Sequence, residues 1–518
     1  MIYRASLPVT SLCGLLSLIG PLPMGQSTLA DDSPSISPRA VAPKGLIVGI
    51  AAFGGGRPLP GEILVLRPGA GPLFPGTLDA SGVKAKPAEW TAEFIRETSR
   101  PEQVALGTLA DGSTVYGKLD ESGEPTGGPM RFVQVGDLWE LAPVAGVGEA
   151  DVTWERRSPK PGEAEEGVPR TKPFELAGGN AIHKVFWFEP AFGEPGILTI
   201  SANMPMIKIW RQLGDTWESE LLFTAEVGDR EHRFRDIEVG DVDGDGQDEL
   251  VLATHDQGKV FVLEQKPTGL EAIEIANRDE GAFVHEVELG DVDGDGLEEI
   301  FTTTSEPNRL DGKPQTGQIE RIDFEGGTWR VSTVEDSKTT HAKEILIADL
   351  EQDGQLELYS SMEAEALEGL DGRAKGGASV RIKRYDFSGD ASTGQVVAEL
   401  PSNMCRFLNA GDVEGDGQLE ILASTKSEGI FRIWFEDSRW QSQPETSGLQ
   451  SGGFEHASVF YDIDGNGSDE LFVADDDGKR IQMWFWDADR ERMRNVVLLD
   501  RSGESDFYLS WSVMPLGS

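Results

Sequence analysis

The sequence predicts an all-β fold, a β-propeller of four-stranded blades; we expect seven blades, with six or eight also compatible. The main observation is an acidic nine-residue segment that recurs five times, at steps of 50, 58, 63 and 50 residues. Each copy lies between two short apolar runs typical of strands, such as 237–240 and 250–254 in the first. Two more strand candidates follow in each repeat, which gives the content of one propeller blade.

The amino-acid composition limits which kinds of molecule this chain can bind. The 518 residues include 90 acidic and 46 basic side chains, for a formal net charge of −44. This charge opposes binding to phosphate backbones, so we expect no nucleic-acid partner. Beyond the N-terminal region no stretch approaches twenty uninterrupted apolar residues, and we expect no transmembrane segment in the mature chain.

The first thirty residues have the pattern of a secretory signal peptide. Arg4 lies in a short basic region, 12–22 are largely apolar, and 28–30 end in a small residue. We expect cleavage near Ala30, a linker over 31–44, and export to the periplasm or the cell exterior. Because Cys13 lies in the signal, Cys405 has no cysteine partner, and the exported chain must be held by packing, hydrogen bonds or metal ions.

We expect the propeller to occupy 45–518. Residues 181–518 hold the acidic repeats and a degenerate copy at 189–196 that lacks the ligand carboxylates. Residues 45–180 are expected to form a degenerate N-terminal blade region, with a worn-down loop at 109–112 and an insertion rich in Pro and Glu at 158–173.

The acidic repeat has the composition of a metal-binding loop. Side-chain oxygens at positions 1, 3, 5 and 9 and a backbone carbonyl at position 7 would form an oxygen cage for a hard cation, and we expect Ca²⁺ in about five structural sites. An EF-hand is excluded because position 12 holds no glutamate in any copy. The residues at positions 1, 3, 5, 7 and 9 are, copy by copy, Asp241, Asp243, Asp245, Gln247 and Glu249; Asp291, Asp293, Asp295, Leu297 and Glu299; Asp349, Glu351, Asp353, Gln355 and Glu357; Asp412, Glu414, Asp416, Gln418 and Glu420; Asp462, Asp464, Asn466, Ser468 and Glu470.

These loops resemble the FG-GAP/VCBS repeats of the integrin α-subunit propeller and of many exported bacterial proteins, over roughly 180–500. The resemblance implies a calcium-stabilised propeller. It does not imply one activity, because the family is functionally diverse.

A second pattern lies six residues before the first aspartate of each copy. This position is cationic or imidazole-bearing in every repeat, and we call the set the basic ring: His183, Arg235, His285, Lys343, Arg406 and His456. It falls at the start of the innermost strand, so we expect it at the mouth of the central channel, on the face away from the acidic loops. The loop holding His255 should reach the same face.

The basic ring allows several interpretations. It could be a set of structural ion pairs, or a site for an acidic carbohydrate or cell-surface ligand, with His255 among its contacts. It could also be the active site of an enzyme resembling polysaccharide lyases or sugar dehydratases, with His285, Lys343, Arg406 and His456 as catalytic candidates. His285, His341 and His456 could bind a transition metal. A protein-interaction or adhesion module remains a further alternative. We expect ligand binding rather than catalysis.

Overall fold

The computed structural model describes most residues from 45 to 517, with gaps of which the longest are 76–83, 158–169, 226–233 and 446–455. The expected signal peptide and linker lie outside the described residues. Apart from one turn of 3-10 helix at Glu149–Asp151, the regular elements of the described part are strands. No helix there is long and apolar enough to cross a membrane. The predicted all-β class is confirmed.

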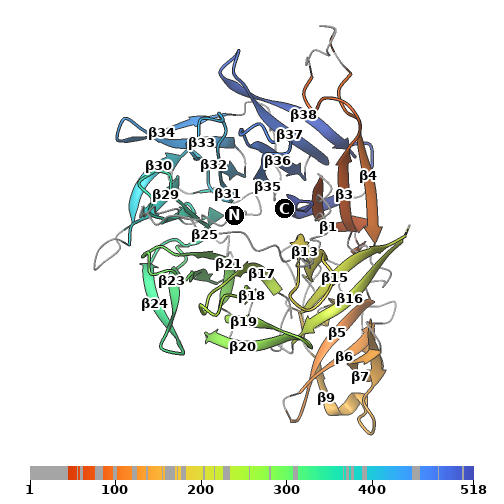
Figure 1. The fold of residues 1–518 in the computed structure, drawn as a ribbon. Helices are drawn as coiled ribbons and strands as arrows, with labels where there is room; N and C mark the ends of the chain where they lie inside the picture. Colours follow the sequence, from red (N-terminus) through yellow and green to blue (C-terminus); the bar gives the residue numbers. More distant parts are fainter. Residues whose placement is uncertain are drawn as a thin grey trace, which may run out of the picture.

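Six antiparallel sheets of four strands follow one another along the described chain, and in Figure 1 they are arranged around a central axis with the first strand of each nearest the centre. The first three sheets are β13 (Ile182–Phe188), β14 (Gly196–Ser201), β15 (Met206–Leu213) and β16 (Thr216–Thr224); β17 (Phe234–Gly240), β18 (Glu249–Thr254), β19 (Lys259–Lys266) and β20 (Gly269–Asn277); and β21 (Phe283–Gly290), β22 (Glu299–Ser305), β23 (Gly317–Glu325) and β24 (Thr328–Ser337).

The next three sheets repeat this order, the fourth with an additional small hairpin, β27 (Leu367–Glu368) and β28 (Arg373–Ala374). They are β25 (Ala342–Ala348), β26 (Glu357–Met362), β29 (Val380–Tyr385) and β30 (Gln395–Leu400); β31 (Cys405–Gly411), β32 (Glu420–Thr425), β33 (Gly429–Glu436) and β34 (Arg439–Pro444); and β35 (His456–Tyr461), β36 (Glu470–Asp475), β37 (Arg480–Asp487) and β38 (Arg492–Asp500).

The two ends of the described chain close the ring in one sheet. The C-terminal β39 (Phe507–Pro515) pairs with β1 (Leu46–Gly54), which continues outward to β3 (Glu62–Pro68) and β4 (Trp90–Arg96), with the short β2 (Arg57–Pro58) beside β1. β39 contacts the inner strands β13 and β35 on its two sides. Closure of this kind leaves few open sheet edges near the axis.

Residues 102–176 form a separate sheet. It contains β5 (Glu102–Leu109), β6 (Thr114–Leu119), β7 (Pro125–Val135), β8 (Leu138–Pro143), β9 (Val152–Trp154) and β12 (Pro173–Leu176), while β10 (Arg156–Arg157) pairs with β11 (Arg170–Thr171). In Figure 1 this sheet lies at the periphery, beyond the ring. The N-terminal region thus divides: β1 pairs with the C-terminal β39 in the closing sheet, whereas β5 and β6 pair with each other in the peripheral sheet. The expected worn-down loop at 109–112, which lies partly outside the described residues, falls between β5 and β6. The described residues form seven sheets around the axis, six of four strands each and the closing sheet. The number of blades stays a prediction.

Neighbouring sheets pack face to face through buried apolar side chains. One cluster combines Val251 of β18 with Val287 and Ile300 of the following sheet, all fully buried. Another joins Tyr359 of β26 to Leu408 of β31. This packing fixes the inner strands, and with them the two ends from which the candidate sites extend.

Candidate functional site

Each acidic loop connects the first and second strands of its sheet, as the sequence predicts. The aspartate at position 1 accepts backbone N–H groups with both oxygens: Asp241 accepts from Gly244 at 2.9 Å and from Gly246 at 3.0 Å. The position-6 glycines of the five copies have φ between 87° and 93°. That left-handed conformation favours glycine and explains its recurrence.

The position-9 glutamate lies at the buried end of the loop. Glu249 is 2% exposed, and its Oε2 accepts the N–H of Val242 at 3.2 Å. Burial and the charge of nearby Asp243 raise the pKa of Glu249 to about 8. In the last loop burial and Asp464 likewise raise the pKa of Glu470 to about 8. A cation among these carboxylates would favour their ionised forms.

The loop residues present fit a hard divalent cation. Within the described residues, four of the loops place carboxylate oxygens within 4.8 Å of one another. An all-oxygen set of this kind suits Ca²⁺. The sets are Asp241, Asp243 and Glu249; Asp291, Asp293, Asp295 and Glu299; Glu351, Asp353 and Glu357; Asp462, Asp464 and Glu470.

The basic ring lies at the opposite end of the inner strands, and its members share a backbone feature that the sequence did not reveal. In five successive inner strands the pairing register shifts at the ring position, so that one extra residue is inserted opposite the second strand. Such β-bulges redirect side chains and are frequent beside functional sites. The ring residues in these bulges are His183, Arg235, His285, Lys343 and Arg406.

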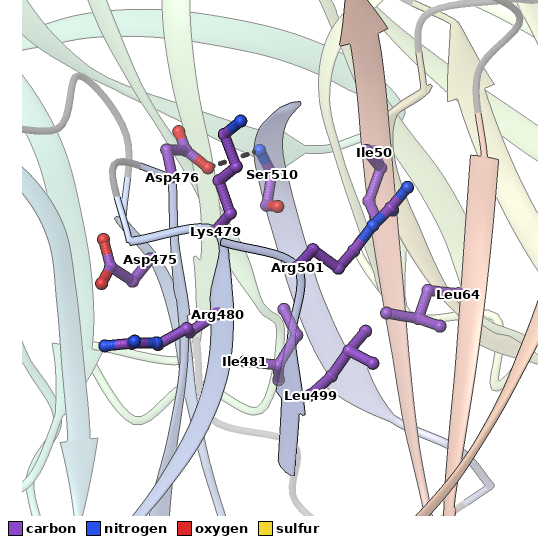
Figure 2. A pocket seen from close by; sticks show the side chains of 10 residues that line it. All are labelled: Ile50, Leu64, Asp475, Asp476, Lys479, Arg480, Ile481, Leu499, Arg501 and Ser510. Atoms are coloured by element: carbon purple, nitrogen blue, oxygen red, sulfur yellow. Dashed lines mark hydrogen bonds between the residues drawn. The ribbon is translucent and has the colours of Figure 1, made fainter. Parts of the chain in front are cut away.

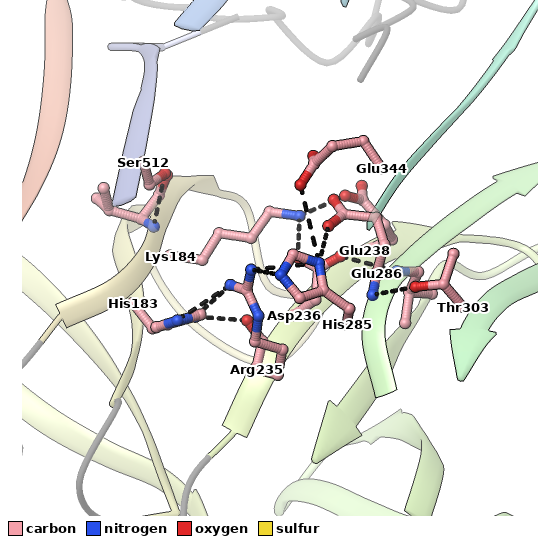
Figure 3. A network of polar contacts seen from close by, with 12 residues as sticks. His183, Lys184, Arg235, Asp236, Glu238, His285, Glu286, Thr303, Glu344 and Ser512 are labelled. Carbon is pink, nitrogen blue, oxygen red and sulfur yellow. Dashed lines mark hydrogen bonds and ion pairs between the residues drawn. The ribbon is translucent and has the colours of Figure 1, made fainter. Parts of the chain in front are cut away.

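Arg235 lies between two imidazoles of the ring (Figure 3). Its Nη1 is 3.0 Å from Nε2 of His183, and its Nη2 is 2.7 Å from Nε2 of His285. An arginine can only donate, so both Nε2 atoms accept. The Nδ1 of His183 faces the carbonyl oxygen of Arg235 at 2.5 Å, which assigns the remaining proton to Nδ1. No carboxylate among the described residues forms an ion pair with Arg235.

His285 is held neutral. Burial, followed by the charge of Arg235, lowers its pKa well below the usual value. Its Nδ1 lies 3.6 Å from Glu286 and 3.8 Å from Glu344, and these three side chains could in principle form a metal site. With Nε2 accepting from Arg235, however, the proton lies on Nδ1, toward the carboxylates. This arrangement disfavours His285 as a transition-metal ligand.

A buried ion-pair layer lies next to the basic ring. The Nζ of Lys184 is 2.6 Å from Asp236 and also pairs with Glu238 on the neighbouring inner strand (Figure 3). Lys184 and Asp236 are 5% and 4% exposed. The adjacent carboxylates raise the pKa of Lys184 despite its burial. Sequence reasoning missed Lys184 and Glu238. The 52 residues from Lys184 to Asp236 equal the spacing from the degenerate copy at 189 to Asp241, which could have suggested the pair.

The other ring members lie close by. The Lys343 Nζ is 5.0 Å from the ring centre of Phe283, and the His255 ring is 3.9 Å from the same ring. The charges of Lys343 and Arg406 both lower the pKa of His285. The structure thus places six of the residues named from the sequence near one another: His183, Arg235, His255, His285, Lys343 and Arg406.

Two further buried titratable groups adjoin Lys343 and Arg406. Burial, with smaller contributions from those two cations, lowers the pKa of His341 to about 3. Burial also raises the pKa of Glu363 to about 7, against the opposing effect of Arg406. Glu363 is 1% exposed, and its Oε1 accepts the N–H of Cys405 at 3.3 Å. His456 begins β35 opposite Asp475; its side chain lies outside the described part.

A separate pocket lies at the closing seam, between β36–β38 and the sheet of β39 and β1 (Figure 2). Arg501, which lines it, pairs with Glu62 of β3 at 3.1 Å, and Asp476 accepts the N–H of Ser510 at 2.9 Å. Both contacts join the C-terminal part of the chain to a neighbouring sheet. We interpret this pocket as part of ring closure.

The FG-GAP-like repeat family model matches residues 241–302, which contain the first two acidic loops. No curated protein matches the sequence. Among solved structures, the crystal structure of a D477G ACO/RPE65 chimera is similar at 12% identity and a TM-score of 0.44, covering 93% of this chain and 94% of the chimera. Together with the recurrence of the acidic loop in five sheets and the radial arrangement of those sheets, the family match supports an FG-GAP repeat β-propeller.

Proposed function

We propose that this protein is an exported, calcium-binding propeller that recognises an anionic ligand, an acidic carbohydrate or a cell-surface component, at its basic ring. The observation that carries the proposal is Arg235. Its guanidinium contacts the imidazoles of His183 and His285, and within the described residues it forms no ion pair with a carboxylate. A half-buried positive charge of this kind attracts an anionic group strongly.

Asp236, the carboxylate next to Arg235 in the chain, does not cancel this charge. Asp236 is paired with Lys184, and its second oxygen accepts the N–H of Val287 at 2.9 Å. Lys343 and Arg406 add positive potential within range of His285. A ligand carboxylate or sulfate could therefore accept from Arg235 without competing for the partners of Asp236.

Calcium and export complete the proposal. Those acidic loops that bind Ca²⁺ would hold it at positions 1, 3, 5, 7 and 9, where the ion would offset the mutual repulsion of the carboxylates. Residues 1–30 would direct export. Mass analysis of the secreted chain would test cleavage near Ala30.

A second candidate function is a lyase-type reaction at the same ring, and Glu363 favours it. A carboxyl whose pKa lies near 7 beside a guanidinium can exchange a proton at neutral pH. Arg235 would then bind the substrate carboxylate.

The test is a ligand panel with the calcium-loaded mature chain. Oligogalacturonate and a heparin fragment are compared with neutral maltoheptaose by calorimetry, while ultraviolet absorbance follows the formation of unsaturated uronates. We expect salt-sensitive binding of an acidic ligand only. A rise in absorbance would favour the lyase, and equal or absent binding of acidic and neutral ligands would contradict anion recognition.

A further inference from the structure

Three consecutive sheets carry an arginine against the acidic loop, at one shared position. Arg321 of β23, Arg384 of β29 and Arg432 of β33 each pair, in strand register, with the residue two places after the position-9 glutamate. All three side chains are largely buried, at 17%, 11% and 8% exposure.

In all three sheets a single guanidinium nitrogen lies between the carboxylates at positions 3 and 9. Nη2 of Arg321 is 2.6 Å from Asp293 and 3.2 Å from Glu299. Nη2 of Arg384 is 2.8 Å from Glu351 and 2.6 Å from Glu357.

The third sheet repeats the arrangement. Nη1 of Arg432 is 2.6 Å from Glu414 and 3.4 Å from Glu420. In these last two loops position 3 is the longer glutamate rather than aspartate. The position-3 glutamate, which would otherwise bind the ion, thus extends to the arginine in both loops.

The arginines occupy the oxygens that a metal ion would need. Oε1 of Glu299 faces Arg321 and its Oε2 accepts the N–H of Val292 at 2.9 Å. Oε1 of Glu420 faces Arg432, and its Oε2 accepts from Val413 at 2.9 Å. A carboxylate oxygen bonded to a guanidinium is less available at the short distances of calcium coordination.

The first and last loops differ. Their sheets have Val262 and Met483 at the arginine position, with exposures of 1% and 0%. Oε2 of Glu249 and Oε2 of Glu470 each accept one backbone N–H, and within the described residues no protein group bonds to either Oε1. These two loops keep a position-9 oxygen available to an ion.

We propose that Arg321, Arg384 and Arg432 replace the metal ion as built-in counter-cations of their loops, so that calcium is required only by loops 241–249 and 462–470. The inference rests on the proposed calcium binding. It predicts two calcium ions per chain instead of about five, because a positive side chain already neutralises the carboxylate pair in the three middle loops.

The test is calcium stoichiometry by equilibrium dialysis of the mature chain, with each protein checked for folding by circular dichroism. We expect two ions for the wild type, one for Glu249→Gln and two for the matched Glu357→Gln variant. Arg384→Met should gain one ion, because it frees the carboxylates of loop 349–357.

The outcomes separate the two proposals. Four or five ions in the wild type, loss of an ion in Glu357→Gln, or no gain in a folded Arg384→Met variant would overturn the arginine replacement while leaving calcium binding intact. No bound calcium in any of the four proteins would overturn calcium binding itself, and the replacement with it.

Discussion

Nη2 of Arg235 lies 2.7 Å from Nε2 of His285, and this contact fixes which ring nitrogen of His285 carries no proton. Because a guanidinium has no acceptor, His285 must keep Nε2 unprotonated, in agreement with its lowered pKa. The imidazole positions the guanidinium without neutralising it. Arg235 is the extra residue in the bulge of β17, and it therefore presents a full positive charge at the basic ring.

Replacing Lys184 by Met tests the buried ion-pair layer. The variant keeps most of the side-chain volume but leaves Asp236 and Glu238 without their cation. Because isolated buried charges are costly, we expect a loss of about 3–5 kcal/mol in the free energy of unfolding, measured by urea titration. The control Lys338→Met removes the partner of Asp336 at the surface and should change stability by less than about 1 kcal/mol. Similar effects of the two substitutions would contradict a structural role for Lys184.

Calcium removal should lower the melting temperature of the mature chain. Each independent site that is saturated a hundredfold above its dissociation constant contributes about 2.7 kcal/mol to the folded state. Differential scanning calorimetry with and without a chelator measures the shift, and added Ca²⁺ in excess should restore the original value. Identical melting curves would show that the loops do not depend on an ion.

Glu363 should make stability fall as pH rises. Burial raises its folded-state pKa to about 7 from the usual value of 4.5, so between these values the folded state binds more protons than the unfolded state. The contribution present below pH 4.5 is lost progressively up to about pH 7, by at most roughly 3 kcal/mol.

Glu363→Gln isolates this effect, because Gln keeps the oxygen that accepts from Cys405 and cannot ionise. Urea titrations between pH 4 and about pH 8 should show the variant gaining stability relative to the wild type as pH rises. Curves that stay parallel would place the ionisation of Glu363 outside this range.

Much of this structure follows from local sequence. The spacing of the repeats located the sheets that hold loops 241–249 to 462–470. The glycines at position 6 adopt the left-handed conformation that favours this residue. The shared position of the basic-ring residues, six places before each acidic loop, could also be identified from the sequence. The bulges were not, because an inserted residue in a strand leaves no residue type that marks it.

Long-range pairings were equally hidden. β39 pairs with β1 although Ile47 and Met514 are far apart in the chain, and no local pattern specifies that partner. The arginines against the loops could have been found by aligning third strands, where Arg321 and Arg384 share a position with Val262.

The most direct test of anion recognition is the affinity of Arg235→Met for oligogalacturonate or the heparin fragment, whichever the wild type binds. Calorimetry with the calcium-loaded chain should show a loss of about tenfold to a hundredfold, the range expected for a charged hydrogen bond, with the melting temperature nearly unchanged. The control Arg480→Met, at an exposed ion pair, should bind like the wild type. Wild-type affinity in a folded Arg235→Met variant would contradict anion binding at the basic ring.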